Sequence, residues 1–181
     1  MEEQKLPRQF EKVIRVLAEG GVILYPADTI WGLGCDVNSD EAIEAIYRIK
    51  NRPERQPFLM LVDSIETLKT YTDKIHPRIE TLLTIHERPL TILYEEPRNV
   101  SSLLISDEGK IGIRVVKSGI CHDLLTAYGG AIVSTSANAH GEPFPTGFGS
   151  ISSSILRKVD HVLQLPIDEE LTGTPSVIAS F

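Results

Sequence analysis

The amino-acid sequence predicts an α/β fold. Short apolar runs alternate along the chain with segments in which apolar residues recur at helical spacing, an arrangement typical of α/β proteins. Two strand candidates, residues 90–94 and 111–116, have no helix between them, which indicates some antiparallel pairing. The 181 residues contain no internal repeat, low-complexity segment or linker, so we expect a single domain over residues 1–181.

The first third of the chain is expected to alternate between helix and extended segments. Apolar residues at helical spacing predict a helix over residues 8–19, which a glycine pair ends. Residues 22–25 are too short a run for a helix and are typical of a buried strand, which leads into a glycine-bearing loop over residues 26–34. Asn38 begins a capping-box pattern and predicts a helix that ends before Pro53.

The middle of the chain is predicted to add three strands and two helices. Residues 58–62 form an apolar strand candidate, and a second capping-box pattern at Asp63 predicts a helix to about residue 71. A further helix begins at His76-Pro77. The strands at 90–94 and 111–116 follow, separated by a polar, turn-rich passage.

The last third repeats this alternation. Ser118 can cap a helix that runs to residue 128, where two glycines end it. The remaining expected elements are, in order, a strand at 131–133, a Gly- and Pro-rich loop at 138–149, a helix at 151–158, and strands at 161–165 and 176–179.

The charge distribution favours a compact anionic ligand over nucleic acid in general. The 18 Lys and Arg residues are outnumbered by 25 Asp and Glu residues, and the net charge of −7 disfavours general nucleic-acid binding. A basic cluster nevertheless occurs at Arg48, Lys50, Arg52 and Arg55, with one acid, Glu54, among these residues. Such a cluster in an acidic chain would attract a small anion.

The cytoplasm is the expected location. The first residues, Met-Glu-Glu-Gln-Lys, lack the basic end and apolar core of a signal peptide, and no apolar run approaches the roughly 20 residues of a membrane span. The two cysteines, Cys35 and Cys121, stand in no paired motif, which is typical of reduced thiols in a cytosolic protein.

Lys50 and Arg52 form the first candidate site. On a continuous helix, residues two apart point in different directions. Because Pro53 disfavours helical backbone before it, we expect the chain to become extended near Asn51, so that Lys50 and Arg52 face one anion together. The alternative is that both cations only complement the dipole at the helix C-terminus.

A second candidate site follows a predicted strand. If the segment Ser134-Thr135-Ser136-Ala137-Asn138 is extended, Ser134, Ser136 and Asn138 project to one face and offer hydroxyl and amide hydrogen bonds. Ligands of α/β sheets bind beyond strand ends, where this segment and the 26–34 loop both lie. The alternative is a polar turn with no ligand.

Several common types of binding and catalytic site are excluded because their sequence motifs are absent. Gly32-Leu33-Gly34 lacks the third glycine and the following helix of a dinucleotide fingerprint, and the chain has no phosphate-binding loop or G-x-S-x-G elbow. The five histidines show no metal-ligand spacing, so no metal held by the protein itself is expected.

Three motifs in this order resemble the YrdC-like family. Tyr25-Pro26-Ala27-Asp28-Thr29 and Trp31-Gly32-Leu33-Gly34 are similar to the family's Tyr-Pro-Thr-Asp/Glu-Thr and Tyr-Gly-Leu-Gly. Lys50-Asn51-Arg52 and Ser136-Ala137-Asn138 match its K-x-R and S-x-N blocks. The resemblance spans nearly the whole chain and implies a YrdC-like twisted mixed sheet, with parallel and antiparallel strands, flanked by helices.

Single-domain members of this family are nucleotidyltransferases that make threonylcarbamoyl-AMP and pyrophosphate from L-threonine, bicarbonate and ATP, for the N6-threonylcarbamoyladenosine (t6A37) modification of tRNA. The resemblance implies Lys50 and Arg52 as the catalytic phosphate clamp, with Mg²⁺ carried by the nucleotide. It further implies ATP contacts from Arg114, Ser134, Ser136 and Asn138, and a threonine pocket bordered by Thr29 and Ser176. Implied partners are the downstream tRNA threonylcarbamoyl-transfer proteins and possible tRNA or RNA contact, with no membrane.

Departures from the family pattern leave the acceptor amino acid open. Ala27 stands where the family usually has Thr, His86-Glu87-Arg88-Pro89 replaces a Trp-Pro-Gly-Pro block, and Arg114-Val115-Val116 lacks the proline of Arg-Val-Pro. Two alternatives follow: a related enzyme that acts on another acceptor, and an RNA-binding module (double-stranded RNA, tRNA or ribosome-associated) without turnover. Dependence of pyrophosphate release on threonine and bicarbonate separates all three.

Overall fold

The computed structural model describes residues 8–53, 56–163 and 171–180. The elements of these ranges follow one another along the chain as α1 (Arg8–Ala18), β1 (Ile23–Pro26), β2 (Trp31–Gly34), α2 (Asp40–Lys50), β3 (Leu59–Val62), α3 (Ile65–Leu68), α4 (Pro77–Ile85), β4 (Leu90–Glu95), the 3-10 helix η1 (Ser102–Leu104), β5 (Lys110–Val115), α5 (Gly119–Tyr128), β6 (Ile132–Ser136), the 3-10 helix η2 (Phe148–Ser150), α6 (Ser153–Leu156), β7 (His161–Val162) and β8 (Val177–Ser180).

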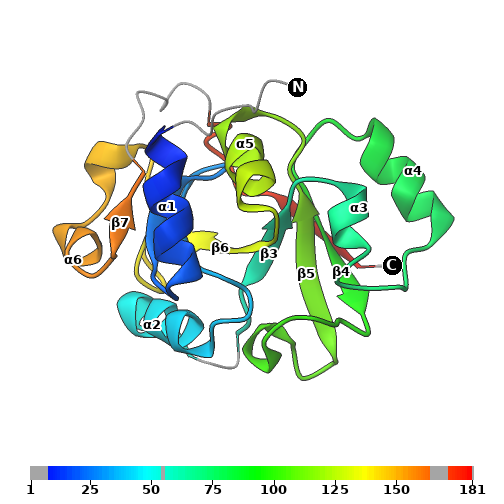
Figure 1. The fold of residues 1–181 in the computed structure, drawn as a ribbon, viewed down its shortest axis with the longest axis horizontal. Coiled ribbons are helices and arrows are strands. Elements are labelled where there is room, and N and C mark those ends of the chain that lie inside the picture. Colours follow the sequence, from blue (N-terminus) through cyan, green and yellow to red (C-terminus); the bar gives the residue numbers. More distant parts are fainter. Residues whose placement is uncertain (1–7, 54–55, 164–170, 181) are drawn as a thin grey trace.

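The strands form one mixed sheet in the order β7-β1-β2-β6-β3-β5-β4-β8. Three pairs are parallel (β1 with β7, β3 with β5, β4 with β8), and four are antiparallel (β1 with β2, β2 with β6, β3 with β6, β4 with β5). Helices flank this sheet, and α1 and α5 lie next to one another over it (Figure 1). The predicted α/β class with a mixed sheet is therefore confirmed, including the antiparallel pairing of β4 and β5.

The apolar core beneath α1 and α5 continues along the sheet into a polar region. Leu61 of β3 and Ile132 of β6 are fully buried in one cluster with the apolar side chains of α1 and α5. Leu59 and Ser134 lie two residues away on the same two strands and pair with each other, so strand alternation places them on the same face. This face is thus apolar under the helices and more polar beyond them.

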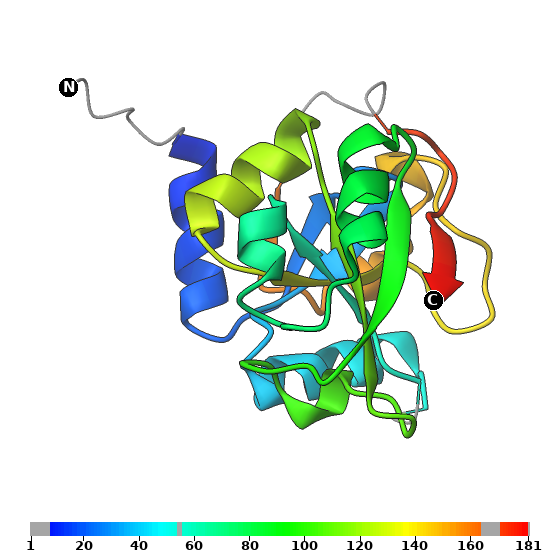
Figure 2. The same cartoon turned by 90° about the vertical axis from the view of Figure 1, so that its right-hand side faces the viewer.

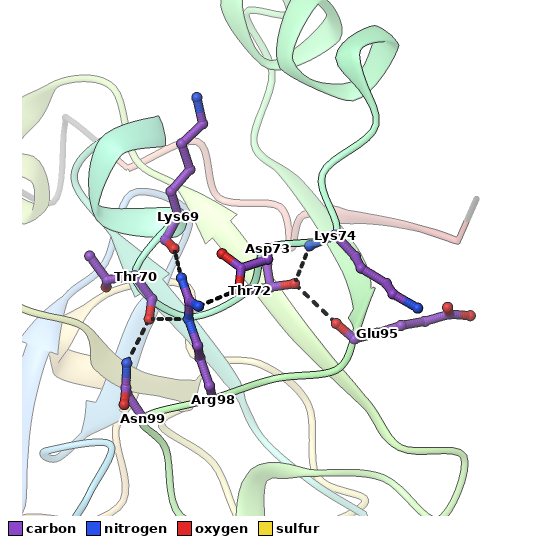
Figure 3. Close-up of polar contacts among 8 residues, drawn as sticks. All are labelled: Lys69, Thr70, Thr72, Asp73, Lys74, Glu95, Arg98 and Asn99. Carbon is purple, nitrogen blue, oxygen red and sulfur yellow. Dashed lines mark hydrogen bonds and ion pairs between the residues drawn. The ribbon is translucent and has the colours of Figure 1, made fainter.

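The segment after α3 and the segment after β4 are tied together by the side chain of Arg98 (Figure 3). Its guanidinium donates from Nε to the carbonyl oxygen of Thr70 (3.2 Å), from Nη2 to that of Lys69 (2.8 Å), and from Nη1 to the carboxylate of Asp73. The carbonyls belong to the end of α3, where helix acceptors have no intrahelical partners. Arg98 therefore holds the start of the long β4–β5 connection against the end of α3.

Some predicted boundaries are wrong in instructive ways. Residues 31–34, expected as loop, form β2, because glycine allows close packing: a Cβ at Gly34 would lie 2.7 Å from the Tyr25 side chain and 2.8 Å from the Val133 carbonyl oxygen. The N-caps of α2 and α3 are Ser39 and Ser64, each one residue later than expected. Their hydroxyls accept the free amide hydrogens of the first helical turn.

Three further elements differ in length from expectation. Helices α3 and α6 are each four residues long, shorter than predicted. Strand β6 extends through Ser136, three residues beyond the predicted strand, because it pairs with both β2 and β3. The last part of the strand expected at 161–165, the basic residue Arg55 and its neighbour Glu54 lie outside the described residues.

Candidate functional site

One cavity of about 640 Å³ lies against the polar part of this sheet face. Six strands contribute to its lining: β2, β6, β3, β5, β4 and β8. Many of the residues that line it on or next to these strands are small, namely Gly32, Thr91, Gly112, Ser134, Ser136 and, next to β8, Ser176. The hollow therefore follows from side-chain size, since large side chains at these positions would fill it as they do under α1 and α5.

Six of the eight site residues predicted from the sequence line this cavity: Thr29, Arg52, Arg114, Ser134, Ser136 and Ser176. They come from positions up to 147 residues apart in the chain (Ser176 minus Thr29). The other two predicted residues, Lys50 and Asn138, are buried next to the cavity and do not line it. The structure thus brings the predicted groups together, but separates Lys50 from Arg52.

Lys50 is turned away from the cavity and into the protein. Its side chain is 1% exposed, and its ammonium donates to the carbonyl oxygens of Ser136 (2.5 Å) and Asn138 (2.6 Å). Burial lowers the pKa of Lys50 to about 8, with a smaller contribution from the neighbouring charge of Arg52. Lys50 therefore fixes the main chain at the end of β6.

The expected extended geometry at Asn51 is wrong. Helix α2 ends at Lys50, as predicted, but Asn51 adopts the left-handed conformation (φ 51°, ψ 41°), and the amide of Arg52 donates back to the carbonyl oxygen of Tyr47 (3.1 Å). This helix-ending turn satisfies carbonyls of the last turn that an extended chain would leave open. As a result, Lys50 points toward β6 and Arg52 toward the cavity.

Asn138 shapes the loop that follows β6. Its side-chain Nδ2 donates to the carbonyl oxygens of Glu142 (2.6 Å) and Ala139 (3.2 Å), while its own carbonyl accepts from Lys50. The side-chain oxygen of Asn138 is buried and has no hydrogen-bond partner among the described residues. Lys50 and Asn138 together hold both ends of the segment between Ser136 and Glu142.

Arg52 lies at one end of the cavity. Its Nε donates to the carbonyl oxygen of Gln56 (3.0 Å), and its guanidinium carbon lies 5.1 Å from the ring centre of Phe58. Phe58 in turn stacks on Tyr47, with 4.2 Å between the ring centres. These contacts orient the guanidinium, and its two terminal nitrogens have no hydrogen-bond partner among the described residues, so they can bind an anion.

Arg114 lies at the other end and is 3% exposed. Its Nη2 donates to a carboxylate oxygen of Asp28 (2.7 Å), whereas its Nε is buried without a hydrogen-bond partner among the described residues. Thr91 pairs with Arg114 across β4 and β5, and the Thr91 hydroxyl lies 2.8 Å from that of Ser176. A buried donor without a partner is uncommon in native proteins, and its place next to the cavity makes the Arg114 end a candidate for ligand contact.

The loop that carries Thr29 is closed over this same end of the cavity. The carbonyl oxygen of Thr29 accepts from the amide of Gly173 (2.9 Å), which joins the loop to the segment before β8. Burial raises the pKa of the Asp28 carboxyl, and Arg114 opposes this effect without outweighing it. Asp28 was not singled out from the sequence, because its partner Arg114 is 86 residues away and no local pattern links them.

The two arginines mark opposite ends of the cavity. Strands β3 and β5 are parallel with Leu61 beside Arg114, and Phe58, which lies under Arg52, precedes Leu61 by three residues. At ~3.3 Å per residue, the two strand positions are roughly 10 Å apart. The cavity is therefore suited to a ligand with two separate anionic groups.

Within the described ranges, no group of three or more His, Cys, Asp or Glu residues is arranged to hold a metal ion. No helix in the part of the chain that the structure covers is long and apolar enough to cross a bilayer.

Comparisons with known proteins agree with this architecture. The family model Sua5_yciO_yrdC, described as "Telomere recombination", matches residues 15–181. The threonylcarbamoyl-AMP synthase of Hahella chejuensis is 34% identical over 140 residues, which cover 76% of this chain and 76% of that relative.

Solved structures share the fold at lower identity. The crystal structure of E. coli YciO superposes with a TM-score of 0.79 at 24% identity and covers 97% of this chain and 85% of its own. P. abyssi Sua5 complexed with L-threonine gives a TM-score of 0.78 at 23% identity and covers 84% of this chain. The present chain spans about half the length of that protein, since the match covers 45% of it.

Proposed function

The chain belongs to the Sua5/YciO/YrdC family, and from that premise we propose that it is an L-threonylcarbamoyladenylate synthase. The relative from Hahella chejuensis carries the name threonylcarbamoyl-AMP synthase and matches this chain over most of both lengths. The product would be threonylcarbamoyl-AMP, the activated group used for the t6A modification of tRNA. This makes the enzyme a nucleotidyltransferase, acting in the cytoplasm on ATP, L-threonine and bicarbonate.

The proposed reaction has two steps that balance without a redox partner. Bicarbonate takes up a proton and loses water to give CO₂, and the amine of threonine then bonds to the carbon of CO₂ and releases a proton, which gives a carbamate. A carbamate oxygen then forms a bond to the α-phosphorus of ATP, and the bond from that phosphorus to the leaving oxygen of pyrophosphate breaks. Negative charge spreads over phosphate oxygens, so catalysis depends on positioning and electrostatic stabilisation.

The nucleotide end would be the one with Arg52. Its oriented guanidinium can contact phosphate oxygens, and the hydroxyls of Ser134 and Ser136 line the adjacent floor of the cavity. An arginine can donate hydrogen bonds to two phosphate oxygens at once, and this bidentate contact favours one orientation of the leaving group. Mg²⁺ would arrive on the nucleotide and keep most of its water ligands.

The acceptor end would be the one with Arg114. A threonine carboxylate can be attracted by the positive charge of Arg114, while Asp28 holds one side of the guanidinium. Thr29 and the hydroxyl pair of Thr91 and Ser176 border the same space. We therefore assign Arg114 to the acceptor, in place of the ATP contact expected from the sequence, because it lies at the far end from Arg52.

Lys50 and Asn138 would act through the backbone. The Lys50 ammonium is occupied by two carbonyl groups, and the Asn138 amide by two others. Both residues are thus positioning residues that hold the floor residue Ser136 and the loop after it. Direct contact of Lys50 with phosphate would require it to leave both carbonyls.

The observation that carries the proposal is the single cavity with Arg52 and Arg114 at opposite ends, because threonylcarbamoyl-AMP has a phosphate and a carboxylate separated by a short neutral linker. The decisive experiment measures pyrophosphate release from ATP with threonine and bicarbonate together, and with either one omitted. We expect release only with both, and a product with the mass of threonylcarbamoyl-AMP.

A substitution that fills the cavity without changing either arginine tests whether the cavity itself is needed. Gly112 lies on its floor, and a Cβ there would meet its nearest neighbours at 3.4 Å, an ordinary contact, so Gly112→Val is expected to fold and to lose the activity. Pyrophosphate release that continues without threonine would indicate that the enzyme uses another acceptor. RNA binding that falls steeply with salt, without any nucleotide consumption, would instead support the non-enzymatic alternative.

A further inference from the structure

The cavity contains two aromatic side chains, Phe58 and Phe144, and they differ in what their rings contact. Phe58 is 3% exposed, stacked on Tyr47 at 4.2 Å and close to the guanidinium of Arg52 at 5.1 Å. Its ring is thus already covered. Phe144 is 52% exposed, so its ring is available to a ligand.

A second exposed apolar side chain lines the same cavity. Ile178 of β8 is 62% exposed, and β8 is the edge strand on the side of the molecule away from α1 (Figure 2). The described residues include four exposed large hydrophobic side chains, Ile85, Phe144, Val177 and Ile178, and two of them line this cavity. Exposed apolar groups at a cavity wall indicate a contact with a ligand.

The position of Phe144 is held by the main chain around it. Asn138 donates to the carbonyl oxygen of Glu142, two residues before Phe144, and Lys50 donates to the carbonyl of Asn138. Pro143 and the buried Pro145 flank Phe144 and restrict the backbone on both sides. The ring is therefore presented by an anchored segment, although it is itself exposed.

We propose that Phe144 stacks on the purine base of the bound nucleotide. The inference rests on the proposed function and adds the base-binding subsite to it. The anionic groups of the substrates are taken by Arg52 and Arg114, which leaves the neutral, planar base for the apolar wall. A cavity of about 640 Å³ is within the range of small-molecule sites.

Stacking on one aromatic ring has a consequence for specificity. Every base has a π-face, so this contact is largely independent of base identity and contributes affinity more than selection. ATP and GTP should therefore lose affinity together when the ring is removed. Inorganic tripolyphosphate, which has no base, should bind Phe144→Ala as it binds the wild type.

The test is isothermal titration calorimetry with ATP, GTP and tripolyphosphate on wild type, Phe144→Ala and Phe144→Trp. From measured stacking contributions, we expect Phe144→Ala to weaken ATP about 5- to 150-fold, with tripolyphosphate changed less than about twofold. Phe144→Trp should retain ATP binding. Ile85→Ala, at a side chain 69% exposed outside the cavity lining, is the matched control and should bind ATP normally.

Three outcomes would overturn the base subsite, and a fourth would overturn only the proposed function. Unchanged ATP affinity in Phe144→Ala overturns the base subsite, and so does an equal loss of ATP and tripolyphosphate, which would mean that the loop, not the ring, matters. Wild-type protein that binds tripolyphosphate but not ATP also overturns it. Wild type that binds ATP through Phe144 but releases no pyrophosphate with threonine and bicarbonate keeps the subsite and overturns the proposed function.

Discussion

The two ends of the cavity are built from different kinds of structure. At the Arg114 end, Thr29, Thr91 and Arg114 are each at most 3% exposed, and two of them are fixed by strand pairing between β4 and β5. At the other end, Arg52 follows a helix C-terminus and Phe144 lies on a loop, both partly open to solvent. One end is preformed by the sheet, whereas the other can adjust around a larger ligand.

This difference separates stability from binding. A buried charge pair is part of the folded structure, so damage to it should lower the free energy of unfolding as well as activity. A half-exposed cation beside the cavity contributes little to folding, so its loss should mainly affect the ligand. The predictions below test this division, beginning with the largest effect.

The substitution Asp28→Asn should lower the free energy of unfolding by about 3–5 kcal/mol, because it leaves the Arg114 guanidinium buried without its carboxylate. Urea denaturation measures this. Glu44→Gln, which removes the partner of the exposed Arg48, is the control and should change stability by less than about 0.5 kcal/mol.

A double variant sharpens this prediction. Asp28→Asn combined with Arg114→Met removes both charges and should recover most of the lost stability. The reason is that the free-energy cost of desolvating a buried ion pair is about as large as the stabilisation from the attraction between its charges. The double variant should remain inactive. Equal instability of the single and double variants would show that the pair is not the source of the loss.

The substitution Arg52→Ala should lower kcat/KM for pyrophosphate release about 10²- to 10³-fold, as expected when one preoriented donor to a transition state is lost, with little change in the free energy of unfolding. Arg48→Ala is the matched control, because Arg48 belongs to the same basic cluster but its side chain is 71% exposed and outside the cavity lining. Wild-type turnover of Arg52→Ala would remove Arg52 from the reaction.

Lys50 should make stability depend on pH in the alkaline range. Burial lowers its pKa from 10.5 to about 8, so between those values the unfolded chain binds the proton that the folded chain has released. The contribution of Lys50 to the free energy of unfolding should therefore rise by about 2–3 kcal/mol as pH increases from about 8 to 10, and should stay constant below about pH 8, where both states bind the proton.

Urea denaturation at pH 7, 8, 9 and 10 measures this slope in wild type and in Lys50→Met. The variant has no titrating group at this position and should lose the rise. Lys74→Met, at an exposed lysine paired with Glu96, should keep it. A slope that persists in Lys50→Met would assign the titration to another group.

The sequence alone determined the order of the elements and most residues of the site. Apolar periodicity and capping residues act over a few positions, so helices such as α1 and α5 and strands such as β3 and β4 could be predicted from short windows. The motifs also brought Arg52, Arg114 and the serines of β6 together as one site, and the structure places these residues around one cavity.

Only the tertiary structure decided how these residues are oriented. The left-handed turn at Asn51 sends Lys50 and Arg52 to different places, and the pairing of β6 with two neighbours extends it through Ser136. The contacts of Arg114 with Asp28, and of Lys50 with Asn138, join residues 86 and 88 positions apart. Such contacts depend on sheet register and on which buried donors find acceptors, and neither is encoded in the sequence near the residues concerned.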